Sequence, residues 1–237
     1  MIISGLQKMT LLDFPGKVAC TVFLHGCNFR CPFCHNSGLL GGKPQPYMDE
    51  GELLAFLKKR VGLLDGVCIT GGEPTLQPEL PQLIRDIRAL GFLVKLDTNG
   101  SRPAVLKALA EEGLLDYVAM DIKNSPSRYC ETAGMAPALL PEVEESARFL
   151  LTGSLDYEFR TTIVKQFHDE AAMAEMGQWL CSLAPGYAPK RLFLQQFADR
   201  DSVLQPGLQA HTEEAMTALR DALLPHCPNT RLRGLDG

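Results

Sequence analysis

The chain has 237 residues, of which 46% are hydrophobic and 22% are charged, a composition typical of a soluble globular protein. Its formal net charge of −5 argues against nucleic acid as a partner attracted by electrostatics. The sequence shows neither the features of a secretory signal nor a run of ~20 apolar residues that could cross a membrane, so we expect a cytoplasmic protein without membrane contact.

Short apolar runs alternate with longer amphipathic stretches along the chain. The runs predict six strands, at Val18–Leu24, Gly66–Thr70, Phe92–Asp97, Tyr117–Ile122, Tyr157–Val164 and Arg191–Phe197. The amphipathic stretches predict six helices, at Asp49–Val61, Pro78–Leu90, Arg102–Glu112, Pro137–Leu151, Glu170–Leu183 and His211–Leu224. Six strand-then-helix units predict an α/β fold with a parallel sheet, as an open sheet or a partial barrel, in a single domain over residues 1–237. Reactive groups are then expected at the carboxyl ends of the strands.

Three of the eight cysteines follow the first predicted strand with the spacing C-x3-C-x2-C, at Cys27, Cys31 and Cys34. In a reducing compartment, clustered cysteines are candidates for metal binding or redox chemistry. Thiolates suit iron–sulfur clusters, zinc or copper(I), and three ligands would leave one iron of a [4Fe-4S] cluster open. Other interpretations are a zinc site completed by His25 or His35, a redox pair, or a C-x-x-C-H haem attachment.

A second motif, Gly71-Gly72-Glu73-Pro74, follows the second predicted strand. Adjacent glycines allow a close approach of the backbone, and a carboxylate beside them can accept hydrogen bonds from an ammonium group. By itself this sequence is also that of an ordinary turn between a strand and a helix.

The cysteine loop, with Phe33 before its last cysteine, and the GGEP segment together resemble the signature of the radical S-adenosylmethionine (SAM) superfamily. The segments DFPGK (13–17), FLHGCNFRC (23–31) and CHN (34–36) further resemble glycyl-radical-enzyme activases, above all those of anaerobic ribonucleoside-triphosphate reductase and next those of pyruvate formate-lyase. The resemblance covers about residues 5–197, and the last forty residues carry no motif.

This resemblance implies a partial (β/α)6 barrel in which Cys27, Cys31 and Cys34 hold a [4Fe-4S] cluster. SAM would be cleaved reductively to methionine and a 5′-deoxyadenosyl radical, which takes a hydrogen atom from a backbone glycine of the partner enzyme. The expected partner is anaerobic ribonucleotide reductase, and flavodoxin or ferredoxin is the expected electron donor.

The resemblance also implies a set of contacts with SAM. Gly72 and Glu73 would meet its amino group, and the aromatic ring before the last cysteine would flank the adenine. A monovalent cation is implied between Asp97 and Asp121. The residues to which contacts with SAM are assigned are Phe33, Gly71, Gly72, Glu73, Asp97, Thr98, Asn99, Asp121, Lys123, Arg160, Thr162 and Val164. Without the neighbouring motifs, residues 97–100 would be an ordinary turn, Lys123 a solvated lysine and Val164 a core residue.

Two other functions are weighed against the activase. A radical SAM enzyme acting on a small molecule, such as 7-carboxy-7-deazaguanine synthase, would share the cysteine loop and the GGE segment but bind a nucleobase-like substrate. A zinc-binding or iron-carrying module without catalytic activity would not bind SAM.

Overall fold

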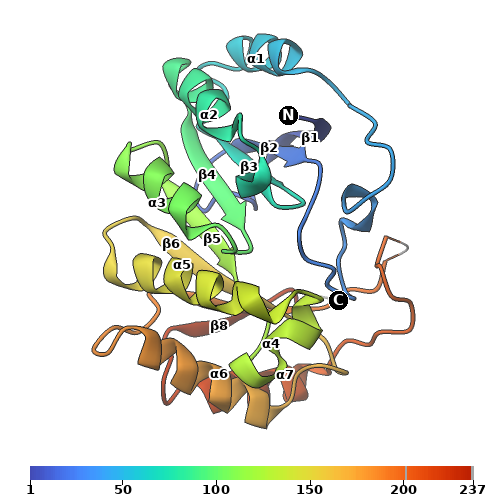
Figure 1. Ribbon diagram of the computed structural model, residues 1–237, viewed down its shortest axis with the longest axis vertical. Coiled ribbons are helices and arrows are strands. Elements are labelled where there is room, and N and C mark those ends of the chain that lie inside the picture. The colour runs from blue at the N-terminus through green and yellow to red at the C-terminus, as the bar shows by residue number, and fades with distance from the viewer. Residues whose placement is uncertain (201, 236–237) are drawn as a thin grey trace. The chain divides into compact units, whose positions relative to one another are not determined.

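The computed structural model describes residues 1–200 and 202–235 (Figure 1). Its strands follow one another in a single sheet in the order of the chain. The strands are β1 (Ile3–Thr10), β2 (Ala19–Leu24), β3 (Gly66–Gly71), β4 (Leu93–Thr98), β5 (Tyr117–Asp121), β6 (Tyr157–Ile163), β7 (Leu192–Gln196) and β8 (Thr230–Arg233).

From β2 onward, helices connect the successive strands, as expected for an α/β fold. The α-helices are α1 (Glu50–Lys58), α2 (Leu80–Ala89), α3 (Pro103–Glu111), α4 (Pro126–Ala133), α5 (Leu140–Thr152), α6 (Glu170–Leu183) and α7 (Glu213–Leu223). Short 3-10 helices are η1 (Ser37–Leu39), η2 (Pro74–Leu76) and η3 (Pro137–Leu139). All six predicted strands and all six predicted helices are confirmed, with bounds that differ by three residues at most.

The chain divides into two compact units, each built from separate segments. The first contains residues 1–28, 38–98 and 104–119, and the second contains residues 29–37, 99–103 and 120–237. The prediction of a single domain is not decided by this division and stays a prediction.

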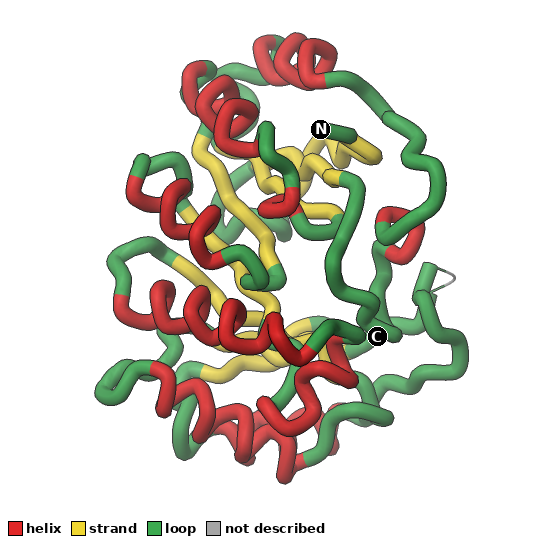
Figure 2. The backbone as a smooth tube through the Cα atoms, viewed as in Figure 1, coloured by secondary structure: helices red, strands yellow, loops and turns green. Residues whose placement is uncertain are grey.

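In the first unit, β1 pairs with β2 in the antiparallel direction, whereas β2, β3 and β4 run parallel. These parallel strands are buried on both faces, which explains why they read as continuous apolar runs. Helix α2 packs against β4 and against α1 (Figure 1), and it turns Leu83, Ile84 and Ile87 inward. Residues 40–49 form a loop (Figure 2) that is tied to β1 by the bridge between Ile3 and Met48.

In the second unit, β6, β7 and β8 run parallel. Helix α6 packs on α7, and α7 packs beside β8 (Figure 1). Asp169 begins α6 by accepting a hydrogen bond from the backbone N–H of Ala172, a cap that satisfies one of the open donors of the first turn.

The strands β1 and β8 and the helix α4 lie outside the six predicted strand–helix units. Strand β8 runs parallel to β7, whereas β1 runs antiparallel to β2, so the sheet is mostly parallel, as predicted. Strand β1 is mostly exposed or half-buried and shows no apolar alternation. Strand β8 has only four residues, two of which are arginines. Neither therefore carries the hydrophobic pattern from which strands are predicted.

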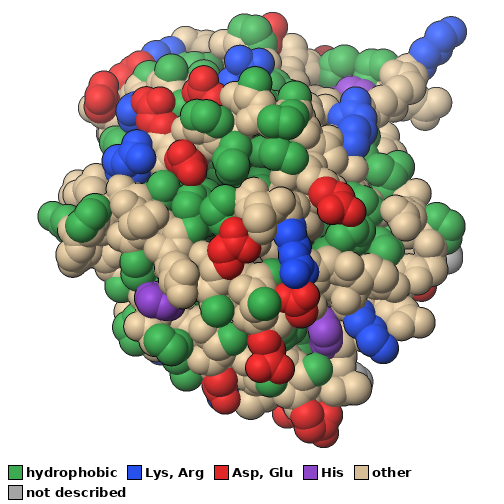
Figure 3. All heavy atoms as spheres, turned by 60° about the horizontal axis from the view of Figure 1, so that its bottom comes forward, with side chains coloured by type: hydrophobic (Ala, Val, Ile, Leu, Met, Phe, Trp, Pro, Cys, Tyr) green, Lys and Arg blue, Asp and Glu red, His purple; other side chains and the backbone are tan. Residues whose placement is uncertain are grey.

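Charged side chains of both signs are interspersed with hydrophobic ones on the face drawn in Figure 3, and several acidic ones gather along its lower edge. None of the described helices is long and apolar enough to cross a membrane.

Candidate functional site

In the first unit, the carboxyl ends of β2, β3 and β4 lie along one edge of the sheet because these strands are parallel. Leu24 at the end of β2 pairs with Gly71 at the end of β3. The segment that leads to Cys27 therefore leaves the sheet beside the GGEP segment. This is the edge at which α/β proteins place their ligands.

The two glycines join the GGEP turn to the segment before Cys27. The backbone N–H of Gly72 donates to the Leu24 carbonyl at 2.9 Å, and the N–H of Glu73 donates to the Gly26 carbonyl at 2.7 Å. A Cβ at Gly71 would lie 2.3 Å from the backbone of Leu24, and one at Gly72 would lie 2.0 Å from the Gly26 oxygen. Gly71 also has φ +125°, a region that favours glycine. Neither position has room for a side chain.

The carboxylate of Glu73 is held in one orientation by threonines. Its side chain is 1% exposed, and Oε1 accepts hydrogen bonds from the Thr75 N–H at 3.1 Å, the Thr75 hydroxyl at 2.5 Å and the Thr98 hydroxyl at 2.7 Å. Glu73 thereby caps η2. These bonds connect the ends of β3 and β4 and fix the orientation of the Glu73 carboxylate, for which the family resemblance implies a contact with the amino group of SAM.

Asp97 lies near the end of β4 and pairs with a lysine of the same strand. Its Oδ1 accepts from the ammonium of Lys95, two residues earlier and therefore on the same face. The Lys95 side chain is 1% exposed, and its Nζ lies 3.7 Å from Sγ of Cys68 on β3. An ammonium buried to this degree needs such a carboxylate partner.

In the second unit, three of the predicted residues form one ionic group. Lys123 donates to Oδ2 of Asp121 at 2.9 Å, and Nε of Arg160 donates to Oδ1 at 3.0 Å. Burial by itself would raise the pKa of Asp121, but the charges of Lys123 and Arg160 outweigh it and lower the pKa to about 2. Burial would lower the pKa of Lys123, yet the carboxylate of Asp121 raises it. All three groups are thus charged at neutral pH, and Lys123 is not a solvated lysine.

Asn99 forms the turn that its sequence also suggested. Its Oδ1 accepts from the Ser101 N–H at 2.9 Å, and the next residue, Gly100, has φ +77°. A Cβ at Gly100 would lie 2.2 Å from the Met120 side chain. Thr162 lies on β6 two residues after Arg160, and both are half-buried.

Phe33 and Val164 share a neighbour, His168. The Phe33 ring lies 6.5 Å from the His168 ring, and the Val164 N–H donates to Nδ1 of His168 at 3.0 Å. The Val164 side chain is fully buried and Phe33 is 3% exposed. Both belong to the packed interior of the second unit, and their contact with adenine stays a prediction.

The cysteine loop is fixed to helix α4 within the second unit. The backbone N–H of Arg30 donates to the carbonyls of Ala133 and Gly134, both at 3.1 Å, and the thiol of Cys31 donates to the Ala133 carbonyl at 3.4 Å. Cys34 turns back with its N–H on the Cys31 carbonyl at 3.1 Å. Burial raises the pKa of the Cys34 thiol in the absence of a metal.

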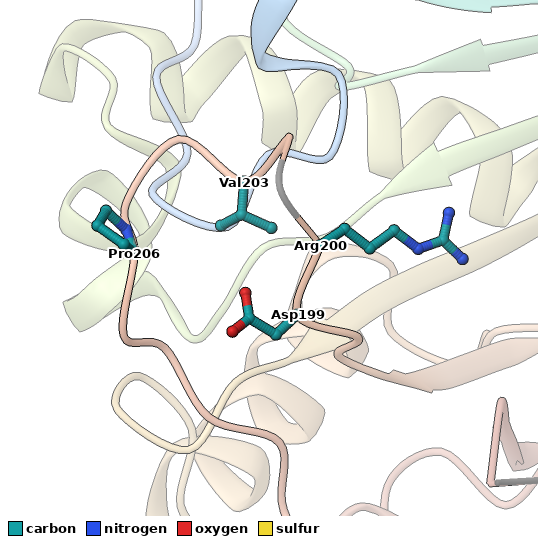
Figure 4. A pocket seen from close by; sticks show the side chains of 4 residues that line it. All are labelled: Asp199, Arg200, Val203 and Pro206. Atoms are coloured by element: carbon teal, nitrogen blue, oxygen red, sulfur yellow. The ribbon is translucent and has the colours of Figure 1, made fainter.

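The segment after β7 also contacts the cysteine loop. His35 stacks on Phe197 at 5.6 Å with an interplanar angle of 14°, and its Nε2 donates to the Ala198 carbonyl at 2.7 Å. The N–H of Gln205 donates to the Pro32 carbonyl at 2.8 Å. This segment borders a hollow of about 360 Å³ (Figure 4), into which the Asp199 carboxylate turns while the Arg200 side chain points away. The residues that line the hollow are Asp199, Arg200, Val203 and Pro206.

Comparison with known proteins decides the family. Residues 21–150 match the model of the radical SAM superfamily. The chain belongs to the radical SAM superfamily. Its resemblance to that family and its α/β fold with a mostly parallel sheet are thereby confirmed.

Two curated relatives of this radical SAM chain have different names. It is 31% identical over 210 residues, 85% of this chain and 82% of the relative, to a Methanocaldococcus jannaschii protein provisionally named as a glycyl-radical enzyme activating enzyme. It is 40% identical over 211 residues, 87% of this chain and 80% of the relative, to 7-carboxy-7-deazaguanine synthase of Hyperthermus butylicus.

A solved structure shares the fold of this radical SAM chain. Streptococcus suis SuiB bound to S-adenosylmethionine is similar with a TM-score of 0.68 and 12% identity, over 90% of this chain and 52% of that chain. The present chain thus spans about half the length of SuiB.

Membership of the radical SAM superfamily implies a [4Fe-4S] cluster and SAM as cofactors. The donor set fits the cluster, because thiols are the ligands of iron–sulfur centres and Cys27, Cys31 and Cys34 all stay outside disulfides. Within the residues that the structure describes, no three His, Cys, Asp or Glu side chains are gathered as a metal-binding group. Cluster ligation by these cysteines therefore stays a prediction.

Sequence reasoning missed three residues that hold the radical SAM motifs in place. Lys95 lay within a predicted strand, and Thr75 and His168 were assigned no role. The signal for Lys95 is a charged residue at an inward position of a strand that is otherwise buried. No such signal exists for Thr75 or His168, whose hydrogen-bond partners emerge only from the fold.

Proposed function

We propose that this chain cleaves SAM reductively and uses the 5′-deoxyadenosyl radical to generate a glycyl radical on a partner enzyme. The expected partner is anaerobic ribonucleoside-triphosphate reductase, with flavodoxin or ferredoxin as the electron donor. The main support for an activase function is the pair of segments around the cysteine loop, DFPGK (13–17) and CHN (34–36). The 31% identical relative named as a glycyl-radical enzyme activating enzyme supports it.

The thiolates of Cys27, Cys31 and Cys34 would hold the cluster. When bound and reduced, the cluster would supply the one electron for reductive cleavage of the sulfur–C5′ bond of SAM, which would give methionine and a 5′-deoxyadenosyl radical able to take a hydrogen atom from the partner's glycine. No side-chain base is required, since no proton is removed in this sequence. The protein contributes binding, orientation and exclusion of water.

Binding of the methionine amino group is proposed for the GGE turn. The backbone at Gly72 packs directly against the Gly26 carbonyl, and the Glu73 carboxylate is held in place by Thr75 and Thr98. A carboxylate fixed in advance loses little entropy when it accepts hydrogen bonds from an ammonium group. Contacts with the rest of SAM are proposed for the ends of the later strands, through Asn99, Thr162 and the ionic group of Asp121, Lys123 and Arg160.

The first test is anaerobic reconstitution with iron and sulfide, reduction, addition of SAM, and quantification of 5′-deoxyadenosine and methionine. Both products should form in equal amounts, and a variant with Cys27, Cys31 and Cys34 changed to alanine should form neither. Cys181→Ala is the matched control and should retain activity, because this thiol lies on α6, outside the three-cysteine motif, and donates to the His226 carbonyl. Purified protein that holds zinc and never cleaves SAM would overturn the proposal.

A second candidate function is the conversion of a small molecule, as in 7-carboxy-7-deazaguanine synthase. The observation that favours it is the 40% identity to the Hyperthermus butylicus enzyme. The active protein should therefore be offered both anaerobic ribonucleotide reductase and pyruvate formate-lyase, with electron paramagnetic resonance as the readout of a glycyl radical, and in parallel the substrate of the synthase. Turnover of that substrate without a glycyl radical would favour the second function.

A further inference from the structure

Two cysteines outside the three-cysteine motif are neighbours within the second unit. Cys181 lies on α6, and Cys227 follows α7 in the turn that leads to β8. The Cys181 thiol donates to the carbonyl oxygen of His226 at 3.0 Å, and this carbonyl belongs to the peptide bond that leads into Cys227. The sulfur of Cys181 is therefore held next to the backbone of Cys227.

A glycine of α6 lets the helix approach this turn closely. A Cβ at Gly177 would lie 3.1 Å from Cβ of His226, so this position leaves little room for a side chain. Cys181 comes four residues later and therefore lies on the same face of α6. The packing of α6 on α7 (Figure 1) thus turns Cys181 toward the segment that carries Cys227.

The two side chains also interact with each other. Burial raises the pKa of the Cys227 thiol to about 12, and Cys181 adds to this rise through its charge and through a hydrogen bond between the two side chains. Both cysteines are free thiols. A disulfide forms without strain only where the two cysteines are already close together, and these two residues meet that condition.

The two thiols differ in their access to solvent. Cys181 is half-buried, whereas Cys227 is fully buried. The backbone of Cys227 is fixed, because its N–H donates to the Leu223 carbonyl at 2.8 Å and its carbonyl accepts from the Thr230 hydroxyl at 2.6 Å. A small oxidant can therefore reach Cys181 first, and Cys227 is held in place to react with it afterwards.

We propose that Cys181 and Cys227 are a redox-sensitive dithiol that a low-molecular-weight disulfide, RSSR, converts to a cross-link between α6 and the turn before β8. The Cys181 thiolate attacks RSSR, forms a mixed disulfide and releases one RSH. The Cys227 thiolate then attacks the Cys181 sulfur and releases the second RSH. The two protein sulfurs are oxidised, RSSR is reduced, and the protons that the cysteines lose end on the released thiols.

The cross-link has a consequence for the second unit. It closes the loop from residue 181 to residue 227, which includes β7 and α7, and so restricts the unfolded chain. The oxidised protein should therefore resist urea better than the reduced protein. In a reducing compartment such a disulfide would be transient and would respond to the redox state. The cluster and SAM take no part in this step, so the inference does not rest on the proposed function.

The test treats wild-type protein, reconstituted with iron and sulfide, with oxidised glutathione under anaerobic conditions. Mass spectrometry of a non-reduced digest identifies each cross-linked pair, so that reactions of the three-cysteine motif are recognised separately. Cys181→Ser and Cys227→Ser each remove one partner. Cys130→Ser is the matched control, because Cys130 is a half-buried cysteine of another helix, α4. The urea midpoint of Trp179 fluorescence is measured before and after oxidation.

For the wild type and Cys130→Ser we expect a peptide that joins Cys181 to Cys227 and a higher urea midpoint after oxidation. The mixed disulfide on Cys181 should be at least about tenfold less abundant than the cross-link, since the second step is intramolecular. Cys227→Ser should stop at one glutathione on Cys181, with no rise in midpoint. Cys181→Ser should leave the buried Cys227 unmodified in the native protein.

A wild type that stops at the mixed disulfide on Cys181, or that leaves both cysteines unmodified, would overturn the inference. So would a cross-linked peptide that appears only when urea is present, because the unfolded chain would then have formed it. A midpoint that rises equally in Cys227→Ser would assign the stabilisation to another reaction of glutathione. If a serine variant does not fold, the peptide map and the midpoint of the wild type decide.

Discussion

Gly72 has an ordinary backbone conformation, and the reason for a glycine there is space alone. A Cβ would lie 2.0 Å from the carbonyl oxygen of Gly26, an atom of the backbone that cannot rotate away. Gly72→Ala should therefore push the GGE turn off the segment before Cys27 and break the bond from the Glu73 N–H to that carbonyl. We expect a loss of about 2–3 kcal/mol in the free energy of unfolding, measured by urea denaturation. Gly41→Ala, with nothing within 4 Å of its Cβ, is the control, and equal midpoints for both variants would contradict the steric argument.

His168 is a buried imidazole whose ring nitrogens form hydrogen bonds with backbone groups. Nε2 lies 2.9 Å from the Lys123 carbonyl oxygen, and Nδ1 lies 3.0 Å from the Val164 nitrogen and 3.1 Å from the Val164 carbonyl oxygen. Burial lowers the pKa of His168 to about 4, below the value of about 6.5 in an unfolded chain. Between these values the unfolded chain binds a proton that the native protein excludes, so the stability falls as the pH falls.

The expected loss from this histidine between pH 7 and pH 4 is about 3 kcal/mol in the free energy of unfolding. His168→Gln keeps a donor and an acceptor but has no titratable proton. The stability difference between wild type and variant should hence shrink as the pH falls from 7 to 4.5, as followed by urea denaturation at each pH. A difference that stays constant with pH would show that the native and unfolded states bind this proton equally, so that folding does not lower the pKa of His168.

At the scale of elements, strand β8 pairs with β7 along its backbone, and one arginine links it to β6 as well. Both oxygens of Glu158 on β6 accept from the guanidinium of Arg233 at 3.1 Å, and this group lies 3.6 Å from the centre of the Phe193 ring on β7. Glu158 is 2% exposed, whereas Arg233 is 39% exposed. Arg233→Ala removes a charged partner of a buried carboxylate, and we expect a loss of about 2 kcal/mol in unfolding free energy, less than for a fully buried pair.

Arg231→Ala is the control on the same strand, because Arg231 is exposed. It should change the unfolding free energy by less than about 0.5 kcal/mol. Comparable losses in the two variants would mean that β8 is stabilised by its backbone pairing with β7 and not by the Arg233–Glu158 contact.

Element prediction from the sequence succeeded where hydrophobic pattern and burial agree, and failed where they do not. The six predicted strands are the buried ones, such as β3, whose first four residues are all buried. Strand β1 was missed because its middle faces outward, and α4 because its eight residues are few for a periodic pattern. The site motifs at Cys27 and Gly71 were found from spacing, but the partners that hold them lie far along the chain. Ala133, for example, anchors the cysteine loop about a hundred residues away.

At the scale of the whole molecule, the chain passes between its two compact units five times. Neither unit is a continuous segment, so neither can complete its contacts while the other is unfolded without closing several loops at an entropic cost. If residues 1–237 form a single domain, as predicted, both units should unfold together in one cooperative transition.

The chain carries a reporter for this test in Trp179, its only tryptophan, which lies in the second unit and donates to Glu144 at 2.9 Å. Gly72→Ala acts in the first unit. If the chain unfolds cooperatively, this variant should shift the urea midpoint of Trp179 fluorescence by the same amount as the midpoint of far-ultraviolet circular dichroism. Arg233→Ala, in the second unit, should shift both midpoints together as well. The opposite result is that Gly72→Ala leaves the fluorescence midpoint unchanged and that its circular dichroism shows two unfolding steps. The two units would then unfold independently, as two thermodynamic domains.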